Sequence, residues 1–295
     1  MHQHTGNWPG KTVANAAGVC RYKEKNFLLV DIPGTYSLMS NSEEEEIARN
    51  YICFGNPDAV VVILDATCLE RNLNLVYQIM EITPNIVVCV NLLDEAKKKG
   101  IHIDLVELER LLGVPVVGTI ARKKKTLENL MKKVKLVCEK QILPSPKKIE
   151  YLPYIEDAID ILEKQIIKIL PEDRKYISRW IALKAIDEDE RILKSIEENF
   201  NMDFRNNDKI KIAKEEVEMI IENNGSNRNN IKDKIISSII FKAENIANDV
   251  LEYENDSYNN KDRKIDKILT SKKFGIPIML AFLGLIFWLT ITGAN

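Results

Sequence analysis

Short apolar runs alternate with amphipathic stretches through the first half of the chain, and this alternation constrains the fold more than any other feature. The runs are apolar on both faces, as strands buried in a parallel sheet are; they cover residues 26–31, 59–65, 85–91 and 114–119. The stretches between them repeat apolar residues at three- and four-residue intervals, as amphipathic helices do; they cover 43–52, 70–81, 104–113 and 126–137. The pattern predicts a doubly wound α/β domain with a mostly parallel sheet, in which ligands collect at the carboxyl ends of the strands.

A second, all-helical domain is expected after residues 143–153, where three prolines interrupt the pattern. No strand signal returns after that point, and residues 154–270 have the periodicity of helices rich in Lys, Glu and Asn. Trp180 and Ile181 lie on the most apolar of these helices, and 223–230 is expected to be a loop. The predicted boundaries are 1–142 for the α/β domain, 143–270 for the helical domain and 271–295 for a membrane segment.

The C-terminus carries an uncharged apolar segment from Phe274 onwards. It approaches the ~20 apolar residues that a membrane-crossing helix requires. Lysines stand directly before it, at Lys264, Lys267, Lys272 and Lys273. Because excess Lys favours the cytoplasmic side, residues 1 to about 270 should be cytoplasmic. A buried core helix is the alternative, and a span that stops at Asn295 is either a tail anchor or part of a larger membrane protein.

Charge and cysteine usage exclude two classes of site. The 42 basic and 44 acidic residues leave a formal charge of −2, so no global field draws the chain to nucleic acid, and no nucleic-acid partner is expected. The five cysteines have irregular spacings with no Cys-x-x-Cys pair, which favours reduced thiols over a zinc site.

The first candidate site is Asp31-Ile32-Pro33-Gly34, which follows the first apolar run. A carboxylate at a strand end can hold Mg²⁺ through water, and a glycine three residues on lets the backbone N–H approach a terminal phosphate. A turn that closes the strand is the structural alternative, for which Pro-Gly is also suited.

The second candidate site is Asn91-Leu92-Leu93-Asp94, at the end of a later strand. Two carboxylate oxygens can accept both the ring N–H and the exocyclic amino hydrogens of guanine, a bidentate contact that adenine cannot make. The same Asn-x-x-Asp spacing recurs at 230–233 and 259–262, where no strand precedes it, and we interpret both as solvated surface.

The third candidate is Thr12, within Gly10-Lys11-Thr12-Val13. A threonine hydroxyl on a mobile loop can complete a Mg²⁺ shell when a γ-phosphate is present and release it after hydrolysis. The segment also resembles the tail of a phosphate loop, Gly-x-x-x-x-Gly-Lys-Ser/Thr. The earlier glycine, however, sits one residue too close, at Gly6, and no apolar strand precedes it. We therefore favour a switch segment.

Together these segments resemble one family, the ferrous iron transport protein B (FeoB) family, over nearly the whole chain. Residues 6–13 are similar to its first switch, 31–38 to its second, 64–75 to the strand and helix that follow, 91–101 to its guanine-selecting segment and 113–127 to its last nucleotide loop. Residues 179–187 are similar to its helical spacer domain, and 264–269 with 274–290 to its entry into the first membrane span.

The resemblance implies a GTP-binding cytoplasmic part of a ferrous iron transporter in the cell membrane, with GTP regulating iron uptake. Its cofactors would be GTP or GDP and Mg²⁺, with Fe²⁺ as the transported ion bound elsewhere. Its partners would be the membrane, the rest of the transporter and small accessory iron-transport proteins. The implied nucleotide-binding residues are Gly10, Lys11, Thr12, Val13, Asp31, Ile32, Pro33, Gly34, Asn91, Leu92, Leu93, Asp94, Ile120, Ala121 and Arg122, and the implied Mg²⁺ residues are Thr12 and, through water, Asp31.

The sequence departs from the family pattern in three places. Members begin with a strand and a phosphate loop ahead of the first switch, and they continue through further spans. We therefore expect an internal fragment, with a GTP-binding domain that lacks its first strand, a truncated membrane helix, and impaired function in a family of slow GTPases. At the third place, Ile120 stands where the family usually has a serine, and Lys124-Lys125-Thr126 replaces a Gly-rich turn.

The sequence leaves two other functions open. One is a non-enzymatic, membrane-tethered pseudo-GTPase scaffold, and the other is a tail-anchored regulatory GTPase.

Overall fold

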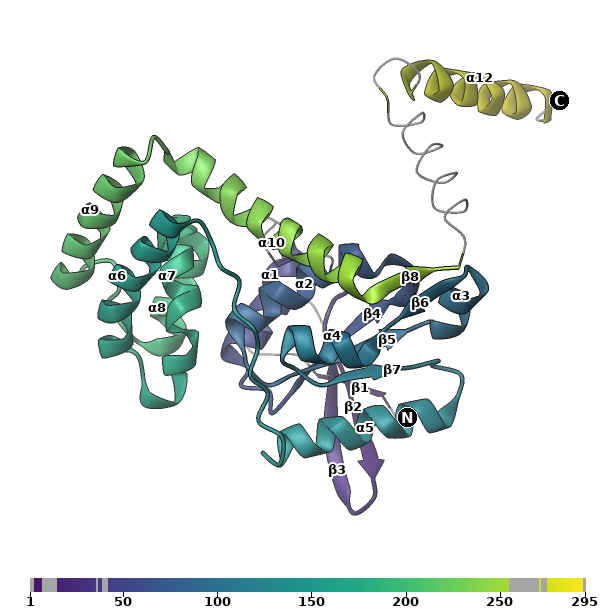
Figure 1. The fold of residues 1–295 in the computed structure, drawn as a ribbon, viewed down its shortest axis with the longest axis horizontal. Coiled ribbons are helices and arrows are strands. Elements are labelled where there is room, and N and C mark those ends of the chain that lie inside the picture. Colours follow the sequence, from purple (N-terminus) through teal and green to yellow (C-terminus); the bar gives the residue numbers. More distant parts are fainter. Residues whose placement is uncertain are drawn as a thin grey trace.

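The computed structural model describes residues 3–6, 15–35, 37–38, 42–254, 271 and 275–293. Figure 1 shows an α/β part, a group of helices beside it and one separate C-terminal helix. A parallel sheet flanked by helices, followed by helices alone and then by an apolar helix, is the expected fold class, and the prediction is confirmed.

The parallel sheet forms from the apolar runs that the sequence pattern marks as buried strands. Its order is β4 (Val60–Asp65), β5 (Ile86–Asn91) and β7 (Val116–Gly118). Helix α5 (Lys124–Cys138) covers one face, and α2 (Leu69–Ile82) and α4 (Leu105–Leu112) cover the other (Figure 1). In the register of β4 and β5, Asp65 lies opposite Asn91, so polar residues meet where these two strands end.

The run at residues 26–31 is a strand, but it is not part of the parallel sheet, which corrects that prediction. It forms β3 (Lys25–Asp31), which pairs antiparallel with β2 (Asn15–Tyr22), and β2 pairs in turn with β1 (Gln3–Gly6). Most of β3 is exposed to solvent, and the Leu28 side chain is 68% exposed. Apolar composition favours a strand here, whereas the pairing partner is set by the short turn that joins β2 to β3.

A short strand follows the helical part, contrary to the expectation that no strand follows residue 153. Strand β8 (Leu251–Tyr253) pairs antiparallel with β6 (Ile101–Ile103), which the apolar pattern also missed. Two further backbone bonds flank the pair: the Asp104 amide donates to the Val250 carbonyl at 3.0 Å, and the Glu254 amide donates to the Gly100 carbonyl at 2.9 Å. Three-residue strands carry too little pattern to be found from sequence.

The helical part packs around a core of aliphatic side chains. Its helices are α6 (Pro153–Ile169), the 3-10 helix η2 (Glu172–Ile177), α7 (Ser178–Ile186), α8 (Glu190–Phe200), α9 (Asp208–Asn223) and α10 (Arg228–Val250). Trp180 and Ile181 are buried on α7, as the apolar composition of that helix predicts. The loop expected at 223–230 is shorter, since α9 continues to Asn223 and α10 begins at Arg228.

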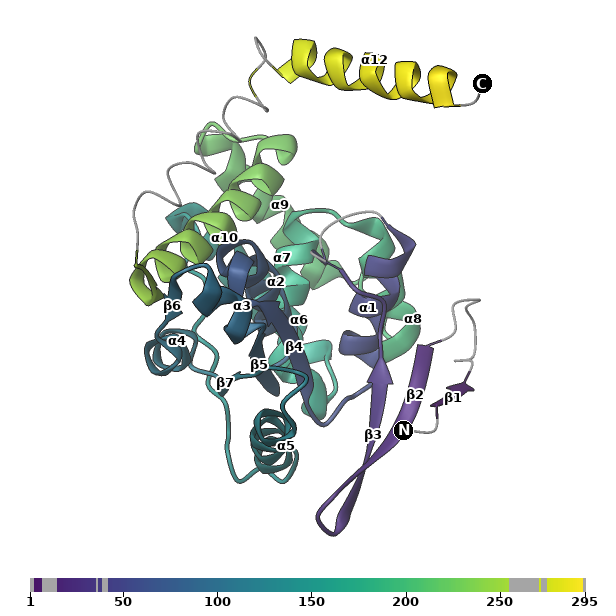
Figure 2. The same cartoon turned by 90° about the vertical axis from the view of Figure 1, so that its right-hand side faces the viewer.

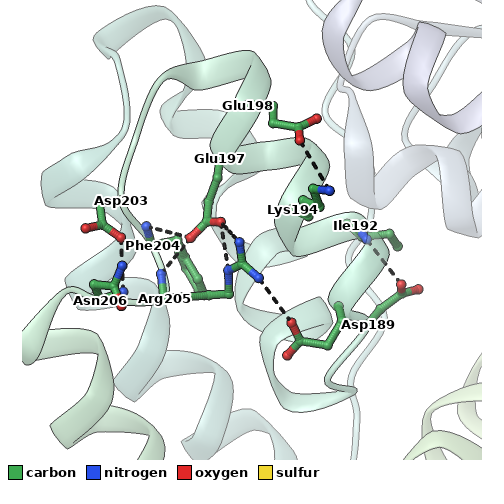
Figure 3. A network of polar contacts seen from close by, with 10 residues as sticks. Asp189, Ile192, Lys194, Glu197, Glu198, Asp203, Phe204, Arg205 and Asn206 are labelled. Carbon is green, nitrogen blue, oxygen red and sulfur yellow. Dashed lines mark hydrogen bonds and ion pairs between the residues drawn. The ribbon is translucent and has the colours of Figure 1, made fainter.

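The connection between α8 and α9 is held by one carboxylate (Figure 3). Glu197 accepts hydrogen bonds from the backbone amides of Phe204 and Arg205, at 3.1 and 2.8 Å, and from the Arg205 guanidinium at 2.8 Å. Burial alone would raise the pKa of Glu197, but these donors hold it below its ordinary value. Glu198, one residue on, faces Lys194 at 3.8 Å on the exposed side of α8.

Helix α1 (Glu43–Phe54) joins the α/β part to the helical part. It begins at Ser42, whose hydroxyl accepts from the Glu45 amide, and its four leading glutamates favour the positive end of the helix dipole. At its other end, the Phe54 ring packs edge-on against Phe200 of α8, with centroids 5.3 Å apart. Arg174 of η2 reaches the Cys53 carbonyl at 3.5 Å.

A second junction is ionic and buried. Arg179 of α7 donates to both oxygens of Glu156 on α6, at 2.8 and 2.9 Å, and its Nε lies 3.6 Å from Glu81 at the end of α2. Burial raises the pKa of Glu81, and the nearby Arg179 opposes that shift. Removing one member of such a buried ionic cluster is costly, because an uncompensated charge remains.

The C-terminal helix α12 (Gly275–Gly293) contains the one window, in the described part of the chain, that is long and apolar enough to cross a membrane. Its mean hydropathy is 2.1 over residues 275–292, and none of that window is buried. The packing of a core helix, the alternative considered from sequence, is therefore not observed.

Candidate nucleotide site

The Asn91 side chain closes β5 and ties two loops together. Its Oδ1 accepts from the Thr119 hydroxyl at 3.1 Å and from the Ala121 amide at 3.2 Å. Thr119 is 1% exposed, and its oxygen lies 3.2 Å from the Cys89 sulfur. Burial raises the pKa of the Cys89 thiol, so this thiol remains protonated. The Cys89 thiol can therefore donate to the Thr119 hydroxyl, which in turn donates to Asn91 Oδ1. These two hydrogen bonds fix the orientation of the Asn91 side chain.

The Asp94 carboxylate lies three residues beyond, in the first turn of α3 (Leu93–Lys98). Leu92 precedes this helix with φ +62°, a left-handed conformation that turns the chain sharply out of β5. Asp94 forms an ion pair with Arg122 of the neighbouring loop. The side chain of Asp94 is 18% exposed and that of Arg122 is 68% exposed, so the pair lies at the surface with the acid on its inner side.

The loop at residues 120–123 is shaped by the Thr126 hydroxyl. The Ile120 amide donates to Thr126 Oγ1 at 3.1 Å, and that hydroxyl donates to the Lys123 carbonyl at 2.7 Å. The Lys124-Lys125-Thr126 segment that replaces the expected Gly-rich turn thus begins helix α5 and fixes the loop by a threonine. Ile120 contributes no side-chain hydroxyl, and its amide is already engaged with Thr126.

The Asp31 to Gly34 segment leaves the end of β3 and lines a cavity of about 530 Å³. Asp31 is exposed, and a Cβ placed on Gly34 would meet nothing within 4 Å, so this side of the cavity is open to a ligand. Just beyond, the Leu38 amide and the Ser37 hydroxyl donate to Gln78 of α2, at 2.6 and 3.2 Å. An exposed carboxylate beside open space suits a Mg²⁺ ion, which keeps several of its waters.

The two candidate segments lie on opposite sides of β4. Asn91 is directly across from the end of β4 at Asp65, whereas Asp31 faces β4 across the cavity. Gly10, Lys11, Thr12 and Val13 lie outside the described residues. Within the described ranges, no group of three or more His, Cys, Asp or Glu side chains could hold a metal ion by itself.

Sequence reasoning missed Thr119 and Thr126 as structural members of this site. Thr119 could have been found, because it is the polar last residue of the apolar run at 114–119, where the strand reaches the edge of the sheet. Thr126 carries no such signal, since its role depends on the path of the loop.

Two family models match consecutive parts of the chain. The model described as ferrous iron transport protein B matches residues 1–134, and the model described as FeoB cytosolic helical domain matches residues 151–272. The chain belongs to the FeoB family. The two FeoB matches follow the α/β part and the helical part in order, which agrees with the resemblance stated from the sequence.

Individual FeoB proteins align with much of the chain. The Fe(2+) transporter FeoB of Staphylococcus aureus (strain MSSA476) is 31% identical over 292 residues, which are 99% of this chain and 41% of that protein. A fusion of Fe(2+) transport protein A and FeoB from Porphyromonas gingivalis is 34% identical over 193 residues, 65% of this chain and 23% of that protein. The chain therefore spans about two fifths of the length of the S. aureus relative.

A solved FeoB structure shares the fold. A point mutant of NFeoB from S. thermophilus, determined with GDP bound, superposes with a TM-score of 0.69 at 26% identity, covering 85% of this chain and 90% of that one.

Proposed function

We propose that this chain is the cytoplasmic guanine-nucleotide-binding part of a ferrous iron transporter, in which the nucleotide regulates iron uptake across a membrane. One observation carries the proposal: in a chain of the FeoB family, the Asn91 to Asp94 segment is held against the Ala121 loop by side-chain hydrogen bonds. Support for the nucleotide comes from the GDP-bound S. thermophilus relative. We propose domain boundaries at 1–142, 143–270 and 271–295.

The proposed roles follow from the chemistry of each segment. Asp94 accepts hydrogen bonds from the guanine ring N–H and amino group, and Asn91 holds the loop that contains Ile120, Ala121 and Arg122 against the base. The backbone at Ile32, Pro33 and Gly34 approaches the terminal phosphate, while Asp31 holds Mg²⁺ through water. Leu92 and Leu93 make the turn that places Asp94. Gly10, Lys11, Thr12 and Val13 form the first switch, with Thr12 as a direct Mg²⁺ ligand.

Hydrolysis is expected to be slow. The residue after Gly34 is Thr35, whose hydroxyl donates to the Ser37 carbonyl at 2.5 Å. In Ras-like enzymes a glutamine at this position orients the attacking water. A threonine whose hydroxyl is bonded to the Ser37 carbonyl cannot do the same.

Helix α1 offers a route from the nucleotide to the helical part. It follows the Asp31 to Gly34 segment in sequence, and its last residues contact η2 and α8 through Cys53 and Phe54. A displacement of that segment on loss of the γ-phosphate would move α1 against these contacts. The β6–β8 pair forms a second link, because β6 follows the Asp94 helix and β8 ends the helical part before the proposed span at α12.

We also propose that the chain lies at a membrane. Helix α12 enters the cell membrane, and residues 1 to about 270 face the cytoplasm. Fe²⁺ is bound and moved by parts of the transporter outside this chain. Accessory proteins are proposed on the strength of the P. gingivalis relative, in which transport protein A and FeoB are fused.

Two experiments test the function. The first is displacement of a fluorescent GDP analogue from the full chain by GDP and by ADP, with GDP expected to compete much more strongly. The second replaces the matching 292-residue segment of the S. aureus relative with this chain and measures ferrous iron uptake in cells. Uptake that depends on Asp94 supports the proposal; equal competition by ADP, or uptake indifferent to Asp94→Ala in an expressed chimera, contradicts it.

A further inference from the structure

Two cavities meet at the junction of the α/β part and the helical part. The smaller one, of about 130 Å³, lies between the end of α2, the start of α7 and the linker before α6. The larger one, of about 510 Å³, lies between α4, α10 and the same linker. Figure 2 shows α10 alongside α2 and α4, and α7 alongside α2. Three basic residues line both cavities and therefore stand between them: Lys147, Lys148 and Arg179.

The walls of the two cavities together carry an excess of positive charge. Five basic and three acidic residues line them: Arg110, Lys147, Lys148, Arg179, Lys242, Glu81, Glu150 and Glu156. Glu81 and Glu156 face Arg179, and Arg110 is bonded to a glutamate of its own helix. The three lysines form no ion pair within the described part of the chain, so Glu150 alone remains to offset them. Such a lining favours an anion.

The smaller cavity is also lined by buried polar side chains that have unused hydrogen-bonding capacity. Tyr77 is 1% exposed and Arg179 is 8% exposed. The Tyr77 hydroxyl, the Arg179 Nε and one carboxylate oxygen of Glu81 have no hydrogen-bond partner among the described residues. Buried polar groups in proteins are almost always hydrogen-bonded. Three such residues around one cavity therefore indicate a polar ligand rather than an apolar one.

Backbone contacts hold the two lysines of the linker in place. The Lys147 amide donates to the Leu112 carbonyl at the end of α4, at 2.9 Å. On the other side of Lys148, the Ile149 carbonyl accepts from the Arg179 guanidinium at 3.1 Å. Because the backbone is fixed on both sides, a ligand that binds the two lysines has to order little more than their side chains.

We propose that this junction binds the phosphate group of a small anion, with Lys147 and Lys148 as its main partners. A phosphate carries up to two negative charges and accepts hydrogen bonds from several donors at once, which suits two lysines beside a guanidinium. It would occupy the smaller cavity, which is larger than a single water needs, and the rest of a phosphate ester would occupy the larger one. Because the walls come from both parts of the chain, a bound phosphate would hold the α/β part against the helical part. This inference does not depend on the proposed nucleotide function.

Calorimetric titration of inorganic phosphate into the full chain in detergent, at constant ionic strength, tests the proposal. Saturable binding is expected, and the double variant Lys147→Gln/Lys148→Gln should bind at least about tenfold more weakly. The matched control is Lys209→Gln/Lys211→Gln, which removes the same charge from α9, outside both cavities. All four lysines are exposed, so circular dichroism should show both variants folded. No saturable binding, as in a cavity that holds only water, or equal affinity of the two variants would overturn the proposal.

A buried variant tests which cavity holds the phosphate. Tyr77→Phe keeps the ring and removes a hydroxyl that has no partner in the described part of the chain. If that hydroxyl bonds the phosphate, affinity should fall about threefold or more. An unchanged affinity would contradict the assignment to the smaller cavity.

Two further probes identify the source of the phosphate. Glycerol 3-phosphate is a soluble ester, and phosphatidic acid in mixed micelles presents the same group on a lipid. At least one of them should compete with inorganic phosphate and lose affinity in the Lys147→Gln/Lys148→Gln variant, and the tighter of the two identifies the carrier. If neither competes, the assignment of the larger cavity to a phosphate ester is wrong.

Discussion

The carboxylate of Asp94 is paired with the guanidinium of Arg122, so the acid assigned to guanine recognition already has a cationic partner from the adjacent loop. The pair bridges two segments that are 28 residues apart in sequence and meet where β5 and β7 end. A guanine base that bound to Asp94 would compete with Arg122 for the same oxygens. The site is therefore partly preorganised, and partly closed by a surface ion pair that is worth at most about 1 kcal/mol.

Replacing Asp94 by asparagine should change the base preference. An amide can donate to the extra carbonyl of xanthine but cannot accept both guanine donors, so GDP should bind about 10- to 100-fold more weakly while XDP gains. Competition of GDP and XDP against a fluorescent nucleotide, into the millimolar range, measures this. Asp104→Asn is the control, since Asp104 caps α4 and asparagine caps equally well. An unchanged ratio of GDP to XDP affinity would refute the assigned role of Asp94.

Thr119→Val should loosen the site from within. The substitution keeps the shape of the side chain but removes the hydroxyl that donates to Asn91. Because a buried hydrogen bond is lost, the free energy of unfolding should fall by about 1–2 kcal/mol. Urea denaturation should show this loss, and amide exchange at Ala121 should become faster. Thr119→Ser retains the hydroxyl and should retain most of the stability. If valine and serine behave alike, the hydrogen bond is not what holds this loop.

Glu197→Gln should destabilise the α8–α9 connection by about 1–2 kcal/mol, because a neutral amide accepts the Phe204 and Arg205 donors less well. Since the pKa of Glu197 is lowered in the folded chain, its contribution is present above the ordinary value of 4.5 and lost as the pH falls through the lowered pKa. Denaturation at pH 7 and at pH 3 measures both effects. Glu198→Gln is the matched control, because Glu198 and its partner Lys194 are both 64% exposed. Equal losses in the two variants would contradict the prediction.

Glu81→Gln should change how stability depends on pH at the junction of α2 and α7. Burial raises the pKa of Glu81 in the folded chain, although Arg179 opposes the shift and Glu156 and Lys148 also act on it. A raised pKa means that the stability contribution is full below the ordinary value of 4.5 and is lost as the pH rises through the folded value. The free energy of unfolding of the unmodified chain should therefore fall, relative to Glu81→Gln, as the pH rises above 4.5. Parallel pH profiles would show that Glu81 titrates normally.

Local sequence determined the parallel sheet and its helices. The apolar runs became β4, β5 and β7, of which β5 is buried on both faces, and the intervening helices need one apolar face each, so both patterns can be found along the chain. The position of Asn91 and Asp94 followed from the same reasoning, because a polar motif directly after a buried strand has to emerge at the edge of the sheet.

Tertiary structure alone decided which segments meet. β8 returns to pair with β6, and Arg122 meets Asp94. These contacts depend on backbone hydrogen bonds and on charges brought together over long stretches of chain, and they leave no periodic trace in local composition.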